Sequence, residues 1–244
     1  MRATFDAAGE VLIVTGGASG IGAALARAHA RAKGTSVVFD VQPPATEIPG
    51  VDHMHVDVAD RDAVLAATHS VLQRHGRIDA LVAGAAIQPR TAVIDMDPGE
   101  WRRTLAVNLD GVVWAAQAVL PAMRASRSGA IVVFASGLAH MGRAQASAYA
   151  ASKGALIAFA KSLAAEVAED RIRVNTLFPG VIDTPQFREA NPGSERAHWL
   201  ATTGIGAVDD VVGPLMFLLS HAATMTGSTL TRDRAFASDA EGGA

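Results

Sequence analysis

The 244-residue sequence contains no cysteine, which excludes disulfides, thiolate nucleophiles and cysteine-ligated zinc. Tyrosine occurs once, at Tyr149, and lysine three times, at Lys33, Lys153 and Lys161, so arginine carries most of the positive charge. The net charge of −3 gives no reason to expect nucleic-acid or membrane binding. Without an apolar signal core or a run of about 18 apolar residues, we expect an unprocessed cytoplasmic protein with no membrane span.

Short β-branched runs alternate with longer alanine-rich stretches along the chain. We expect strands at 11–15, 36–40, 53–56, 78–82, 130–135, 172–177 and 228–231, and helices at 21–33, 62–75, 98–123, 148–167 and 208–219. Strands separated by helices require right-handed crossovers, and continuous apolar runs suit strands buried on both faces. The sequence therefore predicts an α/β fold, a doubly wound parallel sheet (Rossmann fold) of about seven strands with helices on both faces.

We expect a single dinucleotide-binding and catalytic domain over 1–244, because no linker or repeat divides the chain. The segment 183–206 is polar and contains prolines and glycines, which predicts a lid over the substrate. The segment 233–244 is expected to be a C-terminal tail.

A glycine-rich segment, Thr15-Gly16-Gly17-Ala18-Ser19-Gly20-Ile21-Gly22, follows the first predicted strand and opens the first helix. At a helix N-terminus, free N–H groups and the helix dipole favour a pyrophosphate, and glycines let it approach the backbone. In this strand–loop–helix setting the pattern predicts dinucleotide binding, whereas alone it would also fit a tight turn. The expected contacts are Gly16, Ser19, Gly20, Ile21 and Gly22.

Asp40 lies at the end of the second predicted strand. A carboxylate there accepts hydrogen bonds from an adenosine ribose diol and repels a 2′-phosphate. No arginine or lysine lies in the glycine loop or flanks Asp40, so NAD is favoured over NADP. The alternative is an aspartate that caps a turn. Asp57, after the third strand, is either a ligand of the adenine amino group or a turn residue.

Tyr149 and Lys153 are four residues apart in a predicted helix, so both lie on one face. With one tyrosine and three lysines, this spacing arises by chance in about one chain in 80 of this composition. A nearby ammonium favours the phenolate form of tyrosine, so the pair predicts that Tyr149 acts as a general acid and base. The alternative is that the two residues are an exposed pair on a helix surface. Ser136 follows the predicted strand 130–135. It is either an ordinary serine at a strand end or a residue that hydrogen-bonds the substrate oxygen.

The chain is similar to the short-chain dehydrogenase/reductase family over about positions 8 to 232. The resemblance is carried by the glycine pattern of 15–22, Asn108 in Val107-Asn108-Leu109-Asp110-Gly111, Ser136, Tyr149-Ala150-Ala151-Ser152-Lys153, and Pro179-Gly180 followed by Thr184. Singly these signals are weak to moderate, but their order and spacing are specific.

The resemblance implies that Tyr149 exchanges the hydroxyl proton, and that Ser136 positions the substrate oxygen. It also implies that Lys153 lowers the tyrosine pKa and binds ribose. Asn108 would hold a water in a proton relay, whereas without the family it would be a helix-kink or cap residue. Further cofactor contacts are expected at Val58, Ala83, Gly84, Pro179, Gly180, Ile182 and Thr184, in addition to Tyr149 and Lys153.

Two segments depart from the family pattern. The usual Asn-Asn-Ala-Gly after the fourth strand is Ala83-Gly84-Ala85-Ala86, which removes an asparagine that normally joins neighbouring strands. The usual Val-Asp-Gly-Gly near the end becomes Thr231-Arg232-Asp233-Arg234, in a region that often lines a subunit contact or the pocket.

A mostly apolar substrate pocket is expected from Leu138, His140, Gln145, Ile182, Phe187 and Trp199. His53 and His55 share one face of a strand without an evident third ligand, so we expect no metal. The segments 112–116 and 155–160 are apolar nearly all round, which predicts a homo-oligomer, and the resemblance favours a tetramer. Sedimentation as a stable monomer at micromolar concentration would contradict that expectation.

The leading hypothesis is an enzyme that transfers hydride between NAD(H) and a small-molecule secondary alcohol or ketone. One alternative is an NADP-dependent reductase of 3-oxoacyl type. Another is a non-catalytic dinucleotide-binding sensor or scaffold, for which the altered segment Ala83–Ala86 is the only support.

Overall fold

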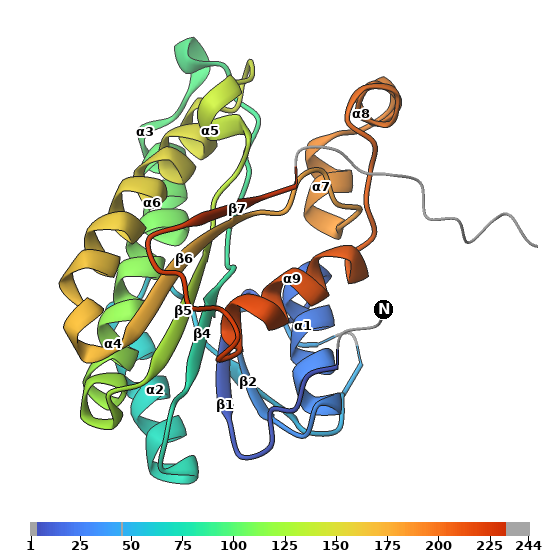
Figure 1. The fold of residues 1–244 in the computed structure, drawn as a ribbon. Helices are drawn as coiled ribbons and strands as arrows, with labels where there is room; N and C mark the ends of the chain where they lie inside the picture. Colours follow the sequence, from blue (N-terminus) through green and yellow to red (C-terminus); the bar gives the residue numbers. More distant parts are fainter. Residues whose placement is uncertain (1–3, 45, 233–244) are drawn as a thin grey trace, which may run out of the picture.

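The computed structural model describes residues 4–44 and 46–232. These residues contain one parallel sheet of seven strands in the order β3-β2-β1-β4-β5-β6-β7 (Figure 1). The strands are β1 (Val11–Thr15), β2 (Thr35–Asp40), β3 (Val51–His55), β4 (Ala80–Ala83), β5 (Gly129–Phe134), β6 (Ile172–Phe178) and β7 (Thr229–Thr231). The predicted doubly wound parallel sheet is confirmed. Its strand order reverses between β1 and β4, where sheets of this kind bind ligands.

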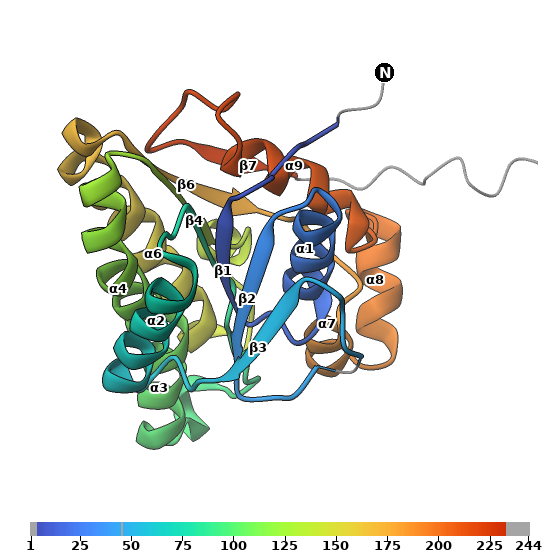
Figure 2. The same ribbon diagram turned by 90° about the horizontal axis from the view of Figure 1, so that it is seen from below.

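Helices cover both faces of the sheet, as the sequence predicts. The α-helices are α1 (Gly20–Arg31), α2 (Arg61–His75), α3 (Pro98–Leu105), α4 (Gly111–Ser126), α5 (Leu138–Met141), α6 (Ser147–Glu166), α7 (Pro185–Ala190), α8 (Ser194–Thr202) and α9 (Asp209–Leu219). Figures 1 and 2 place α2, α4 and α6 on one face and α1 and α9 on the other. Each face therefore buries its own core, with Val64 and Leu156 in the first and Leu25 and Leu215 in the second.

The helix predicted over 98–123 is divided into α3, a π-helical turn η2 (Ala106–Asp110) and α4. By length and composition, the stretch Pro98–Ser126 is apolar enough to cross a membrane, with a mean hydropathy of 1.3. This is weak evidence, because core helices of globular proteins pass the same test. Val112, Ala115 and Val119 are buried in the core that α4 shares with the sheet.

The polar segment predicted as a lid contains two helices, α7 and α8, rather than an irregular loop. Thr184 caps α7 by accepting a hydrogen bond from Phe187 N at 3.1 Å, and proline follows at the first helical position. Asp183 binds Arg188 and Arg196, each at 2.8 Å, which ties the two helices together. In Figure 1 both helices stand to one side of the sheet, beyond the end of β6.

Two short 3-10 helical turns, η1 (Val93–Asp95) and η3 (Ala168–Asp170), lie before α3 and before β6. The tail predicted over 233–244 lies outside the described residues. Asp233 and Arg234 of the unusual C-terminal sequence therefore lie outside them as well.

His29, on α1, is buried at 2% exposure and its Nδ1 lies 3.0 Å from Ser36 Oγ. Burial lowers the pKa of His29 to about 4. The unfolded chain binds a proton at this histidine near pH 6.5, so protonation favours unfolding between about pH 6.5 and pH 4.

Because only the unfolded chain binds this proton, we expect the free energy of unfolding to fall by about 3 kcal/mol as the pH falls from 6.5 to 4. The contribution of His29 is complete above pH 6.5, because the histidine is then neutral in both states. Urea unfolding of the wild type and of His29→Gln between pH 4 and pH 6.5 measures this pH dependence. The slope of the unfolding free energy against pH should flatten in His29→Gln. It should remain in the control His69→Gln, which removes an exposed histidine from α2. Identical slopes in all three proteins would contradict the assignment.

Candidate active site

A cleft of about 1420 Å³ runs past the carboxyl ends of the central strands. It brings together most of the residues that the sequence analysis singles out. The predicted cofactor residues in its lining are Gly16, Ser19, Gly20, Ile21, Gly22, Asp40, Asp57, Val58, Gly84, Tyr149, Lys153, Pro179, Gly180, Ile182 and Thr184. Ser136, Leu138, His140, Phe187 and Trp199 line the same cleft.

Three predicted residues, Ala83, Asn108 and Gln145, do not line the cleft. Ala83 is 1% exposed as the last residue of β4, so its side chain is part of the sheet core instead. Gln145 has an exposed side chain and a positive φ of 63°, and its backbone oxygen accepts a hydrogen bond from Thr91 N at 3.0 Å. The Gln145 side chain is thus exposed outside the lining of the cleft.

The glycine-rich loop is packed so closely that two positions have no room for a side chain. A Cβ atom at Gly16 would lie 2.6 Å from Ala85 Cα, and one at Gly22 would lie 2.5 Å from Gly16 O. Ser19, the N-cap of α1, makes no side-chain cap hydrogen bond. The first N–H groups of the helix are thus available for the phosphates of a dinucleotide, which the loop fits.

Asp40 is fixed at the edge of the cleft by two backbone hydrogen bonds. Its Oδ2 accepts from Ala18 N and its Oδ1 from Gln42 N, both at 2.9 Å. The first bond ties the end of β2 to the glycine loop. A negative charge is thus held at the place where the adenosine ribose of a dinucleotide would lie.

Asp57 has partners on both of its oxygens. Ala59 N donates to Oδ1 at 3.0 Å, and Arg103 Nη2 donates to Oδ2 at 2.9 Å. Burial raises the pKa of Asp57, but these two hydrogen bonds outweigh it and hold the pKa below its ordinary value. The carboxylate is ionised and borders the cleft, and an adenine amino group would share it with Arg103.

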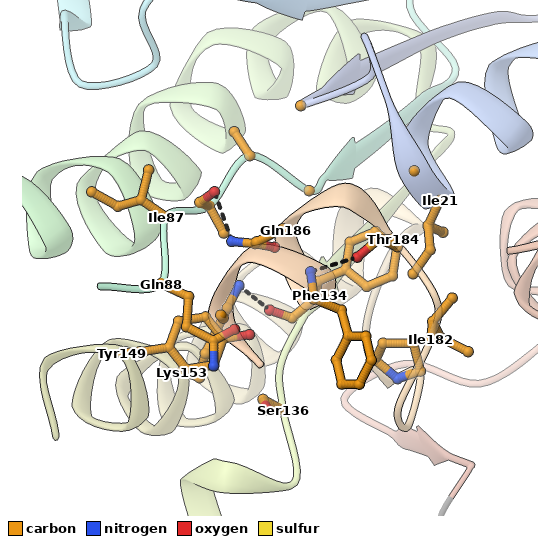
Figure 3. Close-up of a pocket in the computed structure, with 18 of the residues that line it drawn as sticks. Ile21, Ile87, Gln88, Phe134, Ser136, Tyr149, Lys153, Ile182, Thr184 and Gln186 are labelled. Atoms are coloured by element: carbon orange, nitrogen blue, oxygen red, sulfur yellow. Dashed lines mark hydrogen bonds between the residues drawn. The ribbon is translucent and has the colours of Figure 1, made fainter. Parts of the chain in front are cut away.

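Ser136 follows β5, and Tyr149 and Lys153 lie one turn apart on α6 (Figure 3). Lys153 is 2% exposed, and its Nζ donates a hydrogen bond to Phe134 O at 2.8 Å. The same Nζ lies 5.8 Å from the centre of the Tyr149 ring. The end of β5 therefore positions both the serine and, through a backbone carbonyl, the lysine.

Burial governs the ionisation of both groups. It raises the pKa of Tyr149, and a hydrogen bond with the Ser136 side chain acts in the opposite direction. Burial also lowers the pKa of Lys153 to about 8. In this structure desolvation has the largest effect on the pKa of Tyr149, and the Lys153 ammonium donates to a carbonyl. That Lys153 lowers the tyrosine pKa stays a prediction.

Asn108 lies in the π-helical turn and is fully buried behind the cleft rather than in its lining. Its side chain exchanges two hydrogen bonds with the backbone of Ile87, at 2.8 and 2.9 Å. Its Nδ2 also lies 3.1 Å from Ser152 Oγ, which donates to Tyr149 O at 2.7 Å. Asn108 thus connects the segment after β4 to the turn of α6 that contains Tyr149 and Lys153.

The altered segment after β4 is joined to β1 by Thr15. Thr15 Oγ1 accepts hydrogen bonds from Gly84 N at 3.1 Å and Ala85 N at 3.2 Å. These bonds connect neighbouring strands although the family's asparagine is absent. In the C-terminal segment that departs from the family pattern, Arg232 borders the cleft and donates to Asp210 Oδ2 at 3.0 Å.

The structure also adds residues to the cleft that the sequence analysis missed, namely Gln88, Arg90, Arg143, Gln186 and Asn191. Gln186 Nε2 donates to Ala86 O at 3.0 Å, which connects α7 to the segment after β4 (Figure 3). No local signal marks these residues, because each is an isolated polar residue in a loop or a short helix. Within residues 4–44 and 46–232, no group of three or more histidine and acidic side chains could hold a metal ion.

Comparison with known proteins identifies the family. The model of the short chain dehydrogenase family matches residues 10–195. A cis-4-hydroxycyclohexanecarboxylate dehydrogenase of Sinomonas cyclohexanicum is 35% identical, with 92% of this chain and 95% of the relative covered. A 3-oxoacyl-[acyl-carrier-protein] reductase of Thermotoga maritima is 34% identical, with 92% and 96% covered. The crystal structure of a gluconate 5-dehydrogenase from Burkholderia cenocepacia with NADP and tartrate has a TM-score of 0.88 at 34% identity, with 94% and 95% covered.

The chain therefore belongs to the short-chain dehydrogenase/reductase family of oxidoreductases. Members of this family bind nicotinamide dinucleotides.

Proposed function

We propose that this protein transfers a hydride between NAD(H) and a secondary alcohol or ketone, with Tyr149 as the general acid and base. The observation that carries the proposal is that Ser136, Tyr149 and Lys153 line one cleft with the glycine-rich loop (Figure 3). When bound, the nicotinamide supplies the hydride chemistry, and the protein orients it and handles the proton.

The lining of the cleft fits a dinucleotide along its whole length. The glycine loop and the N-terminus of α1 would hold the pyrophosphate, and Asp40 the adenosine ribose. Lys153 would hold the nicotinamide ribose, with Pro179-Gly180, Ile182 and Thr184 beside the nicotinamide.

Tyr149 is well placed to exchange a proton with a substrate oxygen. Its raised pKa keeps the phenol protonated at neutral pH, which is the form that donates a proton when a ketone is reduced. In the opposite direction the phenolate accepts the hydroxyl proton. Ser136, whose hydroxyl is hydrogen-bonded to Tyr149, would hold the same substrate oxygen.

The relatives support two versions of this chemistry. One is named as a dehydrogenase of a hydroxylated ring compound and another as a 3-oxoacyl reductase. NADP in the gluconate 5-dehydrogenase structure supports the NADP-linked alternative. The Asp40 carboxylate supports NAD, because it would lie against a 2′-phosphate. A homotetramer and a cytoplasmic location stay predictions from the sequence.

The wild type should reduce NAD faster than NADP across a panel of secondary alcohols, read by absorbance of the reduced cofactor. Asp40→Asn keeps the shape and an acceptor oxygen but removes the charge that repels a 2′-phosphate. We expect it to shift the ratio of kcat/KM toward NADP by about 100-fold.

Asp60→Asn is the matched control, because Asp60 caps α2 and does not line the cleft. A wild-type preference for NADP, or an unchanged ratio in Asp40→Asn, would contradict the assignment of NAD. Cofactor binding without turnover of any alcohol or ketone would instead favour a sensor or scaffold.

A further inference from the structure

Two arginines line the cleft beside the catalytic residues. Arg143 lies in the segment that connects Ser136 to Tyr149, and Arg90 lies in the segment that follows β4. Their side chains are only 18% (Arg90) and 17% (Arg143) exposed. Neither has a role in cofactor binding or proton transfer as described above, so their presence needs a separate explanation.

The two arginines carry more positive charge than their partner neutralises. Both contact one carboxylate oxygen, Glu195 Oε2, at 3.3 Å from Arg90 Nη1 and 2.7 Å from Arg143 Nη2. Glu100 and Glu189 also border the cleft, but neither forms an ion pair with these arginines in the described part of the chain. Arginine stays protonated, so Glu195 balances at contact distance only one of the two positive charges in this mostly desolvated place.

The guanidinium groups are held in fixed positions. Arg143 lies over the ring of Trp199, 5.1 Å from its centre, and donates to Asn191 Oδ1. Trp199 Nε1 donates to the same Oδ1 at 2.9 Å. Arg90 donates to Ala190 O at 3.1 Å, while its Nε is buried without a hydrogen-bond partner among the described residues. A buried donor without an acceptor is unfavourable.

We propose that Arg90 and Arg143 bind a carboxylate group of the substrate, so that the enzyme acts on a hydroxy acid or an oxo acid. The inference rests on the proposed function, because it concerns the substrate of the same cleft. Guanidinium groups match carboxylates in geometry, and these two arginines already bind the carboxylate of Glu195. A second carboxylate would balance the remaining charge.

A purely structural role would be to hold α8 over the cleft through Glu195. A separate ion-pair cluster lies within the lid itself, where Asp183 binds Arg188 of α7 and Arg196 of α8. Those two arginines are more exposed, at 62% and 48%, and do not line the cleft. The lid therefore has one ion-pair cluster outside the cleft and a second one that faces into it.

The test is calorimetric binding to the full-length protein saturated with NAD. The probes are two pairs matched in size, cyclohexanecarboxylate with cyclohexanecarboxamide, and butanoate with butanamide. We expect at least one carboxylate to bind about 10- to 100-fold more tightly than its amide. Arg143→Gln should abolish the difference, and Arg143→Lys should retain part of it, because lysine keeps the charge without the planar fork. Arg196→Gln, which removes an arginine of the lid that does not line the cleft, should retain all of the difference.

Equal binding within both pairs, no binding of any probe, or an equal loss in Arg143→Gln and Arg196→Gln would overturn the carboxylate site. Turnover separates this result from the proposed function. For 4-oxocyclohexanecarboxylate, Arg143→Gln should raise KM about 10- to 100-fold with little change in kcat, and for the methyl ester it should change neither. Arginine-dependent binding without turnover of any ketone would refute the proposed function alone, whereas turnover of neutral ketones without arginine dependence would refute the carboxylate site alone.

Discussion

Tyr149→Phe is expected to lower kcat by about 10³-fold while leaving NAD binding close to that of the wild type. The substitution removes only the hydroxyl that exchanges a proton with the substrate. The ring still fills its place on α6, and Lys153 keeps its hydrogen bond to Phe134 O. Steady-state kinetics with a secondary alcohol and calorimetric titration with NAD measure the two quantities separately.

Because Tyr149 is the only tyrosine, its ionisation can be followed without interference from another phenol. Absorbance of the tyrosinate in the folded protein should appear at a pH above that of a free tyrosine, since burial raises the pKa of Tyr149. Ser136→Ala should move the transition further up, because the hydrogen bond with Ser136 opposes the effect of burial. Near-normal turnover in Tyr149→Phe would refute the role of this residue.

Lys153→Met is expected to lower kcat/KM by about 100-fold or more and, unlike Tyr149→Phe, also to weaken NAD binding. The ammonium is buried at 2% exposure next to the tyrosine ring and is the cation expected to hold the nicotinamide ribose. Kinetics at varied NAD concentration separate the two losses. Lys33→Met, which removes an exposed lysine that does not line the cleft, makes the same change of charge as a control.

The pH profile of Lys153→Met provides an independent check. Burial lowers the pKa of Lys153 to about 8, so its ammonium is present below pH 8 and is lost as the pH rises through that value. Ketone reduction by the wild type should therefore decline above about pH 8, and this decline should be absent in Lys153→Met. The same decline in both proteins would assign it to another group.

Much of the fold follows from patterns within short stretches of sequence. The alternation of apolar strands with amphipathic helices determines a parallel sheet, because only crossovers bury both of its faces. The local bounds do not follow from such patterns, because the π-helical turn at Asn108 interrupts a helix that the sequence presents as continuous. Its buried hydrogen bonds to Ile87 and Ser152 join segments distant in sequence, and no periodicity encodes them.

By itself the sequence determined the family, the sheet, the glycine loop and the tyrosine–lysine pair, because each depends on spacings of a few residues. Only the tertiary structure decided which side chains face the cleft. It moved Ala83 into the core and Gln145 to the surface, and it brought Arg90, Arg143 and Glu195 together. It also determined the surroundings of the single tyrosine, since the burial that raises the pKa of Tyr149 comes from packing between segments distant in sequence.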